Sequence, residues 1–158
     1  MPLRRKDAII IPGTGGPFRP AVPHLHFVLT ECDASGKVLL APVGSCKGNS
    51  DRSCVLAELD HSFIRHESII LYAYFCLKVE GRLWADVKRG TIAQLEPASD
   101  VLFAKILAGL RVSQFSLPGC RWMIRRPVCD STDHTAATTH ALMATRSAGA
   151  VQLPRIAM

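Results

Sequence analysis

The chain has 158 residues, a length that suits one domain with a short remainder. Hydrophobic residues make up 48% of it and charged residues 20%, a balance that excludes a chain disordered throughout. The longest uncharged apolar stretch, Ser68–Leu77, is about half a membrane span, which excludes a spanning helix, and no early segment has the pattern of a secretory signal. We therefore expect a cytoplasmic protein with no membrane partner, whose six cysteines stay reduced.

The net charge of +6 is shared between two unequal parts of the chain. Residues 1–116 contain 14 basic and 11 acidic residues, whereas residues 117–158 contain five arginines and two aspartates. Alanine and threonine fill 11 of the 20 positions in 131–150, without an apolar period. This composition predicts a folded domain over 1–116 and a basic, disordered tail over 117–158. The positive charge favours an anionic partner but does not identify it.

The first half of the domain is dominated by strand patterns. A short apolar run, Ala8–Ile11, leads into a glycine-rich loop. His24–Thr30 places apolar residues at every second position, which predicts a strand. A hairpin turn at 33–37 then leads to a nearly continuous apolar strand over Lys37–Val43. After a polar loop, Ser53–Leu56 predicts a third, short strand.

The second half changes from strands to a helix. Ser68–Val79 is rich in β-branched and aromatic residues, which predicts one long, bent strand or two short ones. Lys88–Leu95 predicts a further short strand. Apolar residues then recur at four-residue spacing from 102 to 110, which predicts an amphipathic helix over Pro97–Arg111. The predicted fold class is therefore α+β, mainly β: a small barrel followed by a terminal helix and the tail.

Common phosphate-loop and zinc patterns are not met. Gly13–Gly16 lacks the Gly-Lys-Ser/Thr ending of a phosphate loop, and no two cysteines have the spacing of a zinc knuckle, so we expect no cofactor and no metal. One alternative stays open, a thiol enzyme. Cys46 lies beside Lys47, which would lower its pKa, and His61 or His66 could act as the base.

A more informative set of polar residues lies on two loops that join neighbouring strands. In a small barrel, adjacent loops at one end converge. Cleaving a phosphodiester needs an acid or base and a cation for the charge that develops on the phosphate, and in RNA the attacking 2′-hydroxyl belongs to the substrate. The alternative is that these loops are merely solvated. The converging residues would be Ser45, Lys47, Arg65, His66 and Ser68.

The order of these segments resembles the MazF/PemK-type toxins of type II toxin–antitoxin systems. Lys37–Cys46 (KVLLAPVGSC) is similar to the strand and loop that end in the family's catalytic Ser or Thr, with Ser45 at or near that position. Arg65–Ile70 (RHESII) is similar to the later polar segment, and Gly90–Leu110 to the family's terminal helix. The resemblance covers about residues 8–112. The family's Arg-Pro pair corresponds to Arg19-Pro20, but Pro23 separates it from the following strand.

This resemblance implies an SH3-like barrel, a homodimer, a cognate antitoxin and single-stranded RNA as substrate, cleaved to a cyclic phosphate. We predict that Arg65 or Arg52 stabilises the phosphate charge, that His66 or Asp60 does the acid/base work, and that Ser45 positions the phosphate. The predicted substrate contacts are Lys47, Arg52, Ser68, His61 and Arg19. Two other functions stay open: a non-catalytic SH3-like module that binds protein or nucleic acid, and a toxin of the same fold that acts on a topoisomerase.

Overall fold

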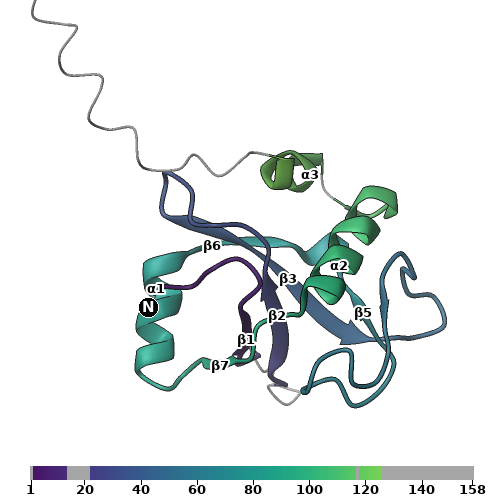
Figure 1. Cartoon of the computed structure of the whole chain (residues 1–158), viewed down its shortest axis with the longest axis horizontal. Coiled ribbons are helices and arrows are strands. Elements are labelled where there is room, and N and C mark those ends of the chain that lie inside the picture. Colours follow the sequence, from purple (N-terminus) through teal and green to yellow (C-terminus); the bar gives the residue numbers. More distant parts are fainter. Residues whose placement is uncertain (1, 14–21, 117, 126–158) are drawn as a thin grey trace, which may run out of the picture. The chain divides into compact units, whose positions relative to one another are not determined.

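The computed structural model describes residues 2–13, 22–116 and 118–125 (Figure 1). These residues all fall within one unit, Met1–Arg126. The predicted substrate contact Arg19 and the predicted tail from residue 126 onward lie outside the described residues.

Seven strands of different lengths form one sheet in the described part of the chain, and every neighbouring pair is antiparallel. The hydrogen-bonded order is β4-β5-β3-β2-β1-β7, with β6 also paired to β3. The strands are β1 (Ala8–Ile11), β2 (His24–Val28), β3 (Lys37–Ser45), β4 (Val55–Leu56), β5 (Ser68–Ile70), β6 (Cys76–Val79) and β7 (Ala93–Leu95).

The long strand β3 organises the sheet. One of its edges pairs with β2, and the other pairs first with β6 and then with β5. Between β5 and β6 the chain forms a short 3-10 helix, η1 (Tyr72–Tyr74), so the second of the two predictions for Ser68–Val79, two short strands, is correct. The amide of Leu71 donates to the carbonyl of Pro42 at 2.9 Å, which keeps the interruption close to β3.

Helix α1 (Glu80–Lys88) was not predicted, and it shortens the strand expected over Lys88–Leu95 to β7. The helix is short, contains Gly81 and buries a single residue, Leu83, so its sequence gives only a weak helix signal. It ends at Lys88 with Arg89 as its C-cap, and Gly90 follows with a φ of +75° that suits glycine after a helix. The amide of Gly90 donates to the carbonyl of Val87.

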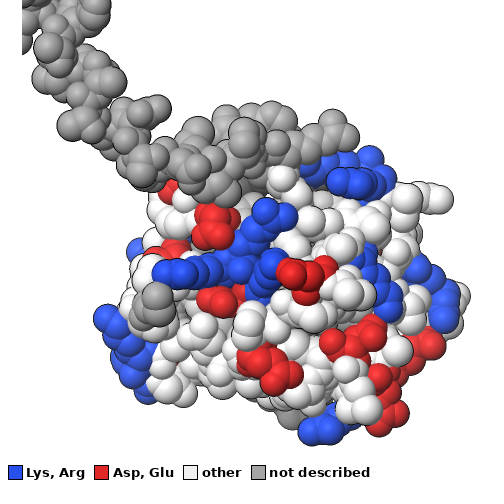
Figure 2. All heavy atoms as spheres, viewed as in Figure 1, with Lys and Arg blue, Asp and Glu red and all other residues white. Residues whose placement is uncertain are grey.

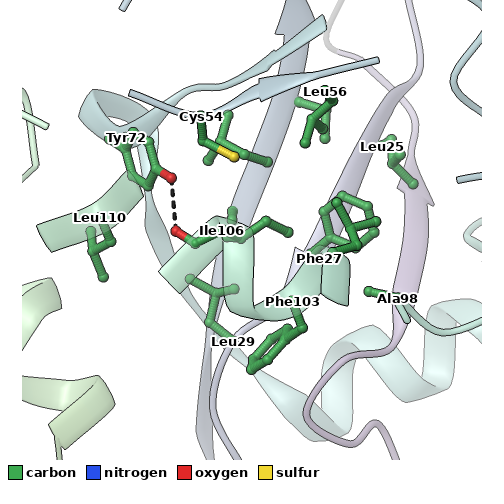
Figure 3. Packing of buried hydrophobic residues seen from close by; sticks show 14 of the residues in the cluster. Leu25, Phe27, Leu29, Cys54, Leu56, Tyr72, Ala98, Phe103, Ile106 and Leu110 are labelled. Atoms are coloured by element: carbon green, nitrogen blue, oxygen red, sulfur yellow. Dashed lines mark hydrogen bonds between the residues drawn. The ribbon is translucent and has the colours of Figure 1, made fainter. Parts of the chain in front are cut away.

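Helix α2 (Asp100–Val112) confirms the amphipathic helix predicted over Pro97–Arg111, but it begins at Asp100 and a further helix follows it. The hydroxyl of Ser99 caps it by accepting from the amide of Leu102. Its apolar face packs into the main core against the sheet, and the hydroxyl of Tyr72 donates to the carbonyl of Ile106 at 2.8 Å (Figure 3). A mainly antiparallel sheet with a few helices confirms the predicted α+β, mainly β class.

The sequence placed residues 118–125 in the tail, but in the structure they form helix α3 (Pro118–Arg125). Cys120 is buried in the main core. The guanidinium of Arg121 donates to the carbonyl of Ser113 at 2.6 Å and to the hydroxyl of Ser116 at 2.7 Å. The described fold therefore continues beyond the predicted boundary at 117. Among the described residues, no helix is long and apolar enough to cross a membrane.

Candidate active site

The candidate site is built where β3 ends and β5 begins. Ser45, the last residue of β3, lies opposite Ser68, the first residue of β5. Ser68 is only 5% exposed, and its hydroxyl donates to the backbone carbonyl of His66 at 2.9 Å. This hydrogen bond holds the backbone just before β5 and thereby fixes the backbone position of His66. Ser68 is therefore a supporting residue in the structure.

Ser45 and His66 are in direct side-chain contact. Oγ of Ser45 and Nε2 of His66 are 3.0 Å apart, and both residues are exposed. An imidazole within hydrogen-bond reach of a hydroxyl can accept or return a proton, which is the first geometric requirement for acid/base chemistry. These two residues come from separate strand ends and are 21 positions apart in the sequence.

A cleft of about 480 Å³ opens beside this contact. Ser45, His66, Arg65 and Ser68 all line it, so the structure brings together four of the residues that sequence reasoning selected. Arg65 is exposed, and no acidic side chain pairs with it among the described residues. The cleft therefore combines a hydroxyl, an imidazole and a cation that is available to an anion.

One buried residue places Arg65 and His66 at the cleft. Ile64 is 3% exposed and belongs to the main core. Its amide donates to the carbonyl of His61 at 2.8 Å, and its carbonyl accepts from the amide of Leu59 at 3.2 Å. Because these contacts fix Ile64, the two residues that follow it emerge at a defined position.

The structure does not bring Asp60 and His61 into the cleft. His61 is 4% exposed, its Nε2 lies 2.9 Å from the carbonyl of Glu96, and its ring packs edge-on against Phe27. The carboxylate of Asp60 accepts from Nζ of Lys105 at 2.9 Å, and this hydrogen bond lowers the pKa of Asp60. Both side chains are engaged in contacts that hold the loop against its neighbours, and neither lines the cleft.

Arg52 and Lys47 lie near the site in sequence but do not line the cleft. The guanidinium of Arg52 forms an ion pair with Glu67 at 3.1 Å and also donates to Sγ of Cys46 at 3.2 Å. Lys47 is exposed in a turn closed by hydrogen bonds to Ser50. Arg65 is therefore the cation best placed to act inside the cleft.

Cys46 does not have the features of an activated thiol. Its hydrogen bond with Glu67 raises the pKa of Cys46, whereas Lys47 was expected to lower it. A raised pKa reduces the thiolate fraction at neutral pH, and the thiolate is the nucleophilic form. The structure thus gives no support to the alternative of a thiol enzyme.

Sequence reasoning missed the apolar part of the cleft. Phe63 could have been noticed, because it is a partly exposed aromatic residue inside an otherwise polar segment. The other lining residues carry ordinary core or loop patterns, so only their spatial convergence reveals them. They are Val22, Pro23, Leu25, Val43, Gly44 and Ile64, and the exposed His24 at the start of β2 also lines the cleft.

The surface charge does not by itself mark a site. On the face shown in Figure 2, a group of Lys and Arg side chains is bordered by Asp and Glu side chains. Charges of both signs are interspersed, as expected from the near balance of basic and acidic residues in 1–116. The arrangement in the cleft is thus more informative than the net charge.

No family model matches the chain, and no curated protein matches it. Among solved structures, the chain is similar to a crystal structure of MazE–MazF (Form-III) from Deinococcus radiodurans, with a TM-score of 0.45 and 14% sequence identity. The match covers 67% of this chain and 90% of that chain.

Proposed function

We propose that this protein is an endoribonuclease that cleaves single-stranded RNA without a metal. The observation that carries the proposal is the 3.0 Å contact between Ser45 and His66 in a cleft that Arg65 also lines. Transesterification of RNA needs a proton acceptor, a proton donor and a cation, while the substrate supplies the nucleophile. The cleft offers each of these groups.

In the proposed reaction His66 accepts the proton of the 2′-hydroxyl, whose oxygen attacks the adjacent phosphorus. Arg65 stabilises the negative charge that develops on the non-bridging oxygens. The bond from phosphorus to the 5′-oxygen breaks, and that oxygen takes up the proton from the His66 imidazolium. The products are a 2′,3′-cyclic phosphate and a 5′-hydroxyl. Ser45 holds the imidazole and positions the phosphate.

The apolar side of the cleft supports an unpaired substrate. Phe63 provides a partly exposed aromatic ring, and Val43 and Ile64 extend the apolar lining. A base can occupy such a surface only after it leaves its neighbours in the stack, which is easiest in single-stranded RNA. When a base contacts Phe63, its phosphate would lie in the same cleft as Arg65 and His66.

The test uses the purified full chain and end-labelled single-stranded RNAs in buffer containing EDTA. We expect cleavage with cyclic phosphate ends, and a loss of about 10²–10³-fold in rate for Arg65→Ala. Arg82→Ala is the matched control, because Arg82 is an exposed arginine on α1 that does not line the cleft. Intact RNA under all conditions would overturn the proposal, and intact RNA without growth arrest on induction would favour the non-catalytic binding module.

We further propose that the protein is a toxin that acts through this cleavage, as the order of the segments in the sequence suggests. The protein would then act in the cytoplasm as a homodimer and be inhibited by a cognate antitoxin. Induced expression should arrest growth, the Arg65→Ala variant should not, and co-expression of a small acidic protein from the neighbouring gene should restore growth. Growth arrest without RNA cleavage would instead favour a protein target such as a topoisomerase.

A covalent hydrolase is the second candidate, because a Ser hydroxyl within hydrogen-bond reach of a His is also how a nucleophile is activated. The two candidates differ in the fate of Ser45. A fluorophosphonate probe should label Ser45 only if Ser45 is a nucleophile. In the ribonuclease, Ser45→Ala should slow the reaction without changing the cyclic phosphate product.

A further inference from the structure

A second groove of about 360 Å³ lies between the N-terminal segment, α1 and β7. It shares no lining residue with the cleft that holds Ser45 and His66. Its use therefore does not depend on the proposed cleavage reaction. Its lining residues are Pro2, Arg4, Asp7, Trp84 and Gln94.

The walls of this groove are fixed to the fold. Leu3 is buried, and its amide donates to Oε1 of Glu80 on α1 at 2.9 Å. The amide of Lys6 donates to the carbonyl of Val28 at the end of β2. Gln94 lies opposite Ile9 in the β1–β7 ladder. The N-terminal segment is thereby tied to a helix and a strand on either side of the groove.

The polar groups in the groove are arranged to accept hydrogen bonds. Oδ2 of Asp7 accepts from the backbone amide of Arg4 at 2.8 Å and from Nε2 of Gln94 at 3.3 Å. Because Gln94 turns its NH₂ group to the carboxylate, its carbonyl oxygen is left as an acceptor for a ligand. A carboxylate can accept about four hydrogen bonds, so Asp7 also retains capacity.

The groove also supplies an aromatic surface and positive charge. Trp84 is partly exposed, and its indole lines the groove. Nζ of Lys88, which does not line the groove, lies 5.6 Å from the centroid of the indole ring. Arg4 is exposed at the groove and can pair with a phosphate.

We propose that this groove binds a guanine base that carries a phosphate. The ring would stack on Trp84, as bases commonly do on aromatic side chains. The N1–H and N2–H₂ donors of guanine would meet the acceptors of Asp7 and Gln94. Adenine presents an unprotonated N1 on the same edge, which a carboxylate repels. Arg4 would bind the phosphate.

The same chemistry is present in a free guanosine nucleotide and in an unpaired guanosine of an RNA, and the experiment separates these sources. Isothermal titration calorimetry with the full chain measures the affinity for GMP and for AMP. The same measurement compares a short 2′-O-methyl RNA that contains one guanosine with an RNA that has adenosine at that position. The 2′-O-methyl group blocks attack by the 2′-oxygen, so the result is independent of whether the protein cleaves RNA. A guanine preference only in the oligonucleotides would identify RNA as the source.

We expect the guanine ligand to bind about tenfold or more tightly than the adenine ligand. Asp7→Asn should abolish that preference, and Trp84→Leu should weaken binding about tenfold, whereas Trp84→Phe retains a ring and most of the affinity. Glu58→Gln, an exposed carboxylate outside the groove, is the control. If Trp84→Leu does not fold, the shift of the Trp84 indole NMR signal on addition of GMP to the unmodified chain replaces it. Equal binding of both bases, or a preference that survives Asp7→Asn, would overturn the proposal.

Discussion

The loop between β4 and β5 carries two similar pairs of polar residues, Asp60-His61 and Arg65-His66, which fold into opposite environments. The first pair is held by its neighbours: Asp60 accepts from Lys105 on α2, and His61 is buried with its ring nitrogen at the carbonyl of Glu96. The second pair is exposed and lines the cleft. Each pair is a charged residue followed by a histidine, and the histidine is buried in the first pair and exposed at the cleft in the second.

The difference between the two pairs comes from what lies next to them. The first pair faces α2 and the segment that leads into it, while the second follows Ile64, whose burial ends the contact with the core. Beyond Ile64 the chain turns toward the end of β3, where Ser45 meets His66. The contacts on the two sides of Ile64 thus distinguish the buried His61 from the exposed His66.

The largest effect is expected for a substitution in the exposed pair, Arg65-His66. Replacing His66 with Gln removes the proposed proton acceptor, and we expect the rate of RNA cleavage to fall by about 10²–10⁴-fold. Because His66 is exposed, the thermal unfolding temperature should stay close to that of the unmodified protein. A rate that is unchanged would remove His66 from the reaction, and a large loss of stability would contradict the division between the two halves of the loop.

The next prediction tests α2, the support of the buried pair. A Cβ atom at Gly109 would lie 2.2 Å from the hydroxyl oxygen of Tyr72 and 2.8 Å from the carbonyl oxygen of Ser53. Gly109→Ala should therefore lower the free energy of unfolding by about 3 kcal/mol, although alanine is the better helix former. Urea denaturation measures the change.

Gly81 provides the matched control for this substitution. It lies in α1, and a Cβ atom there would have no neighbour within 4 Å. Gly81→Ala should keep or raise the stability by up to about 1 kcal/mol, because only the helix propensity changes. If both alanine variants behave alike, close packing at Gly109 is not what seats α2 on the sheet.

Much of the fold could be predicted because its main elements carry periodic apolar patterns. β2 alternates and α2 repeats at four-residue spacing, so each shows in the sequence which face it buries, and the continuous apolar run of β3 indicates a strand buried on both faces. Helix α1 is short, contains Gly81 and buries only Leu83, so its sequence gives a weaker helix signal than that of α2. The helix at Pro118–Arg125 follows a Pro-Gly pair that usually marks a break, and its anchoring contacts to α2's C-terminal end are tertiary.

The candidate site was predictable in part for a related reason. Ser45, Arg65 and His66 lie at strand ends, and the order of the strands is enough to bring such ends together. Asp60 and His61 are also a charged residue followed by a histidine in the same loop, but their contacts with Lys105 and Glu96 join positions 35 or more residues apart. Local sequence contains no information about partners at that distance, so the two pairs could be told apart only in the structure.

The third prediction tests the buried histidine directly. His61→Ala removes the side chain that contacts the carbonyl of Glu96 and the amide of Phe63, and it opens space beside Phe27. Loss of a buried hydrogen-bonding side chain should cost about 2 kcal/mol of unfolding free energy. The comparison with His66→Gln is informative, because His61→Ala should lower the free energy of unfolding, whereas His66→Gln should lower the rate of RNA cleavage. If the two variants lose stability equally, burial does not distinguish the histidines.

The smallest effect is expected for Asp60→Asn. Lys105 and the amide of Ala57 donate to the carboxylate and lower the pKa of Asp60, so its folded-state pKa is below that of the unfolded chain. A carboxylate of this kind contributes stability above its unfolded pKa, near pH 4, and the contribution is lost as the pH falls through the folded value.

The ion pair of Asp60 is partly solvated, because its side chain is 30% exposed and that of Lys105 is 43% exposed. At pH 7 and low salt Asp60→Asn should therefore cost at most about 1 kcal/mol. The difference from the unmodified protein should shrink with added salt and again below about pH 4. A difference that stays constant from pH 7 to pH 3 would mean that the amide hydrogen bonds, rather than the charge on Asp60, fasten this half of the loop to α2.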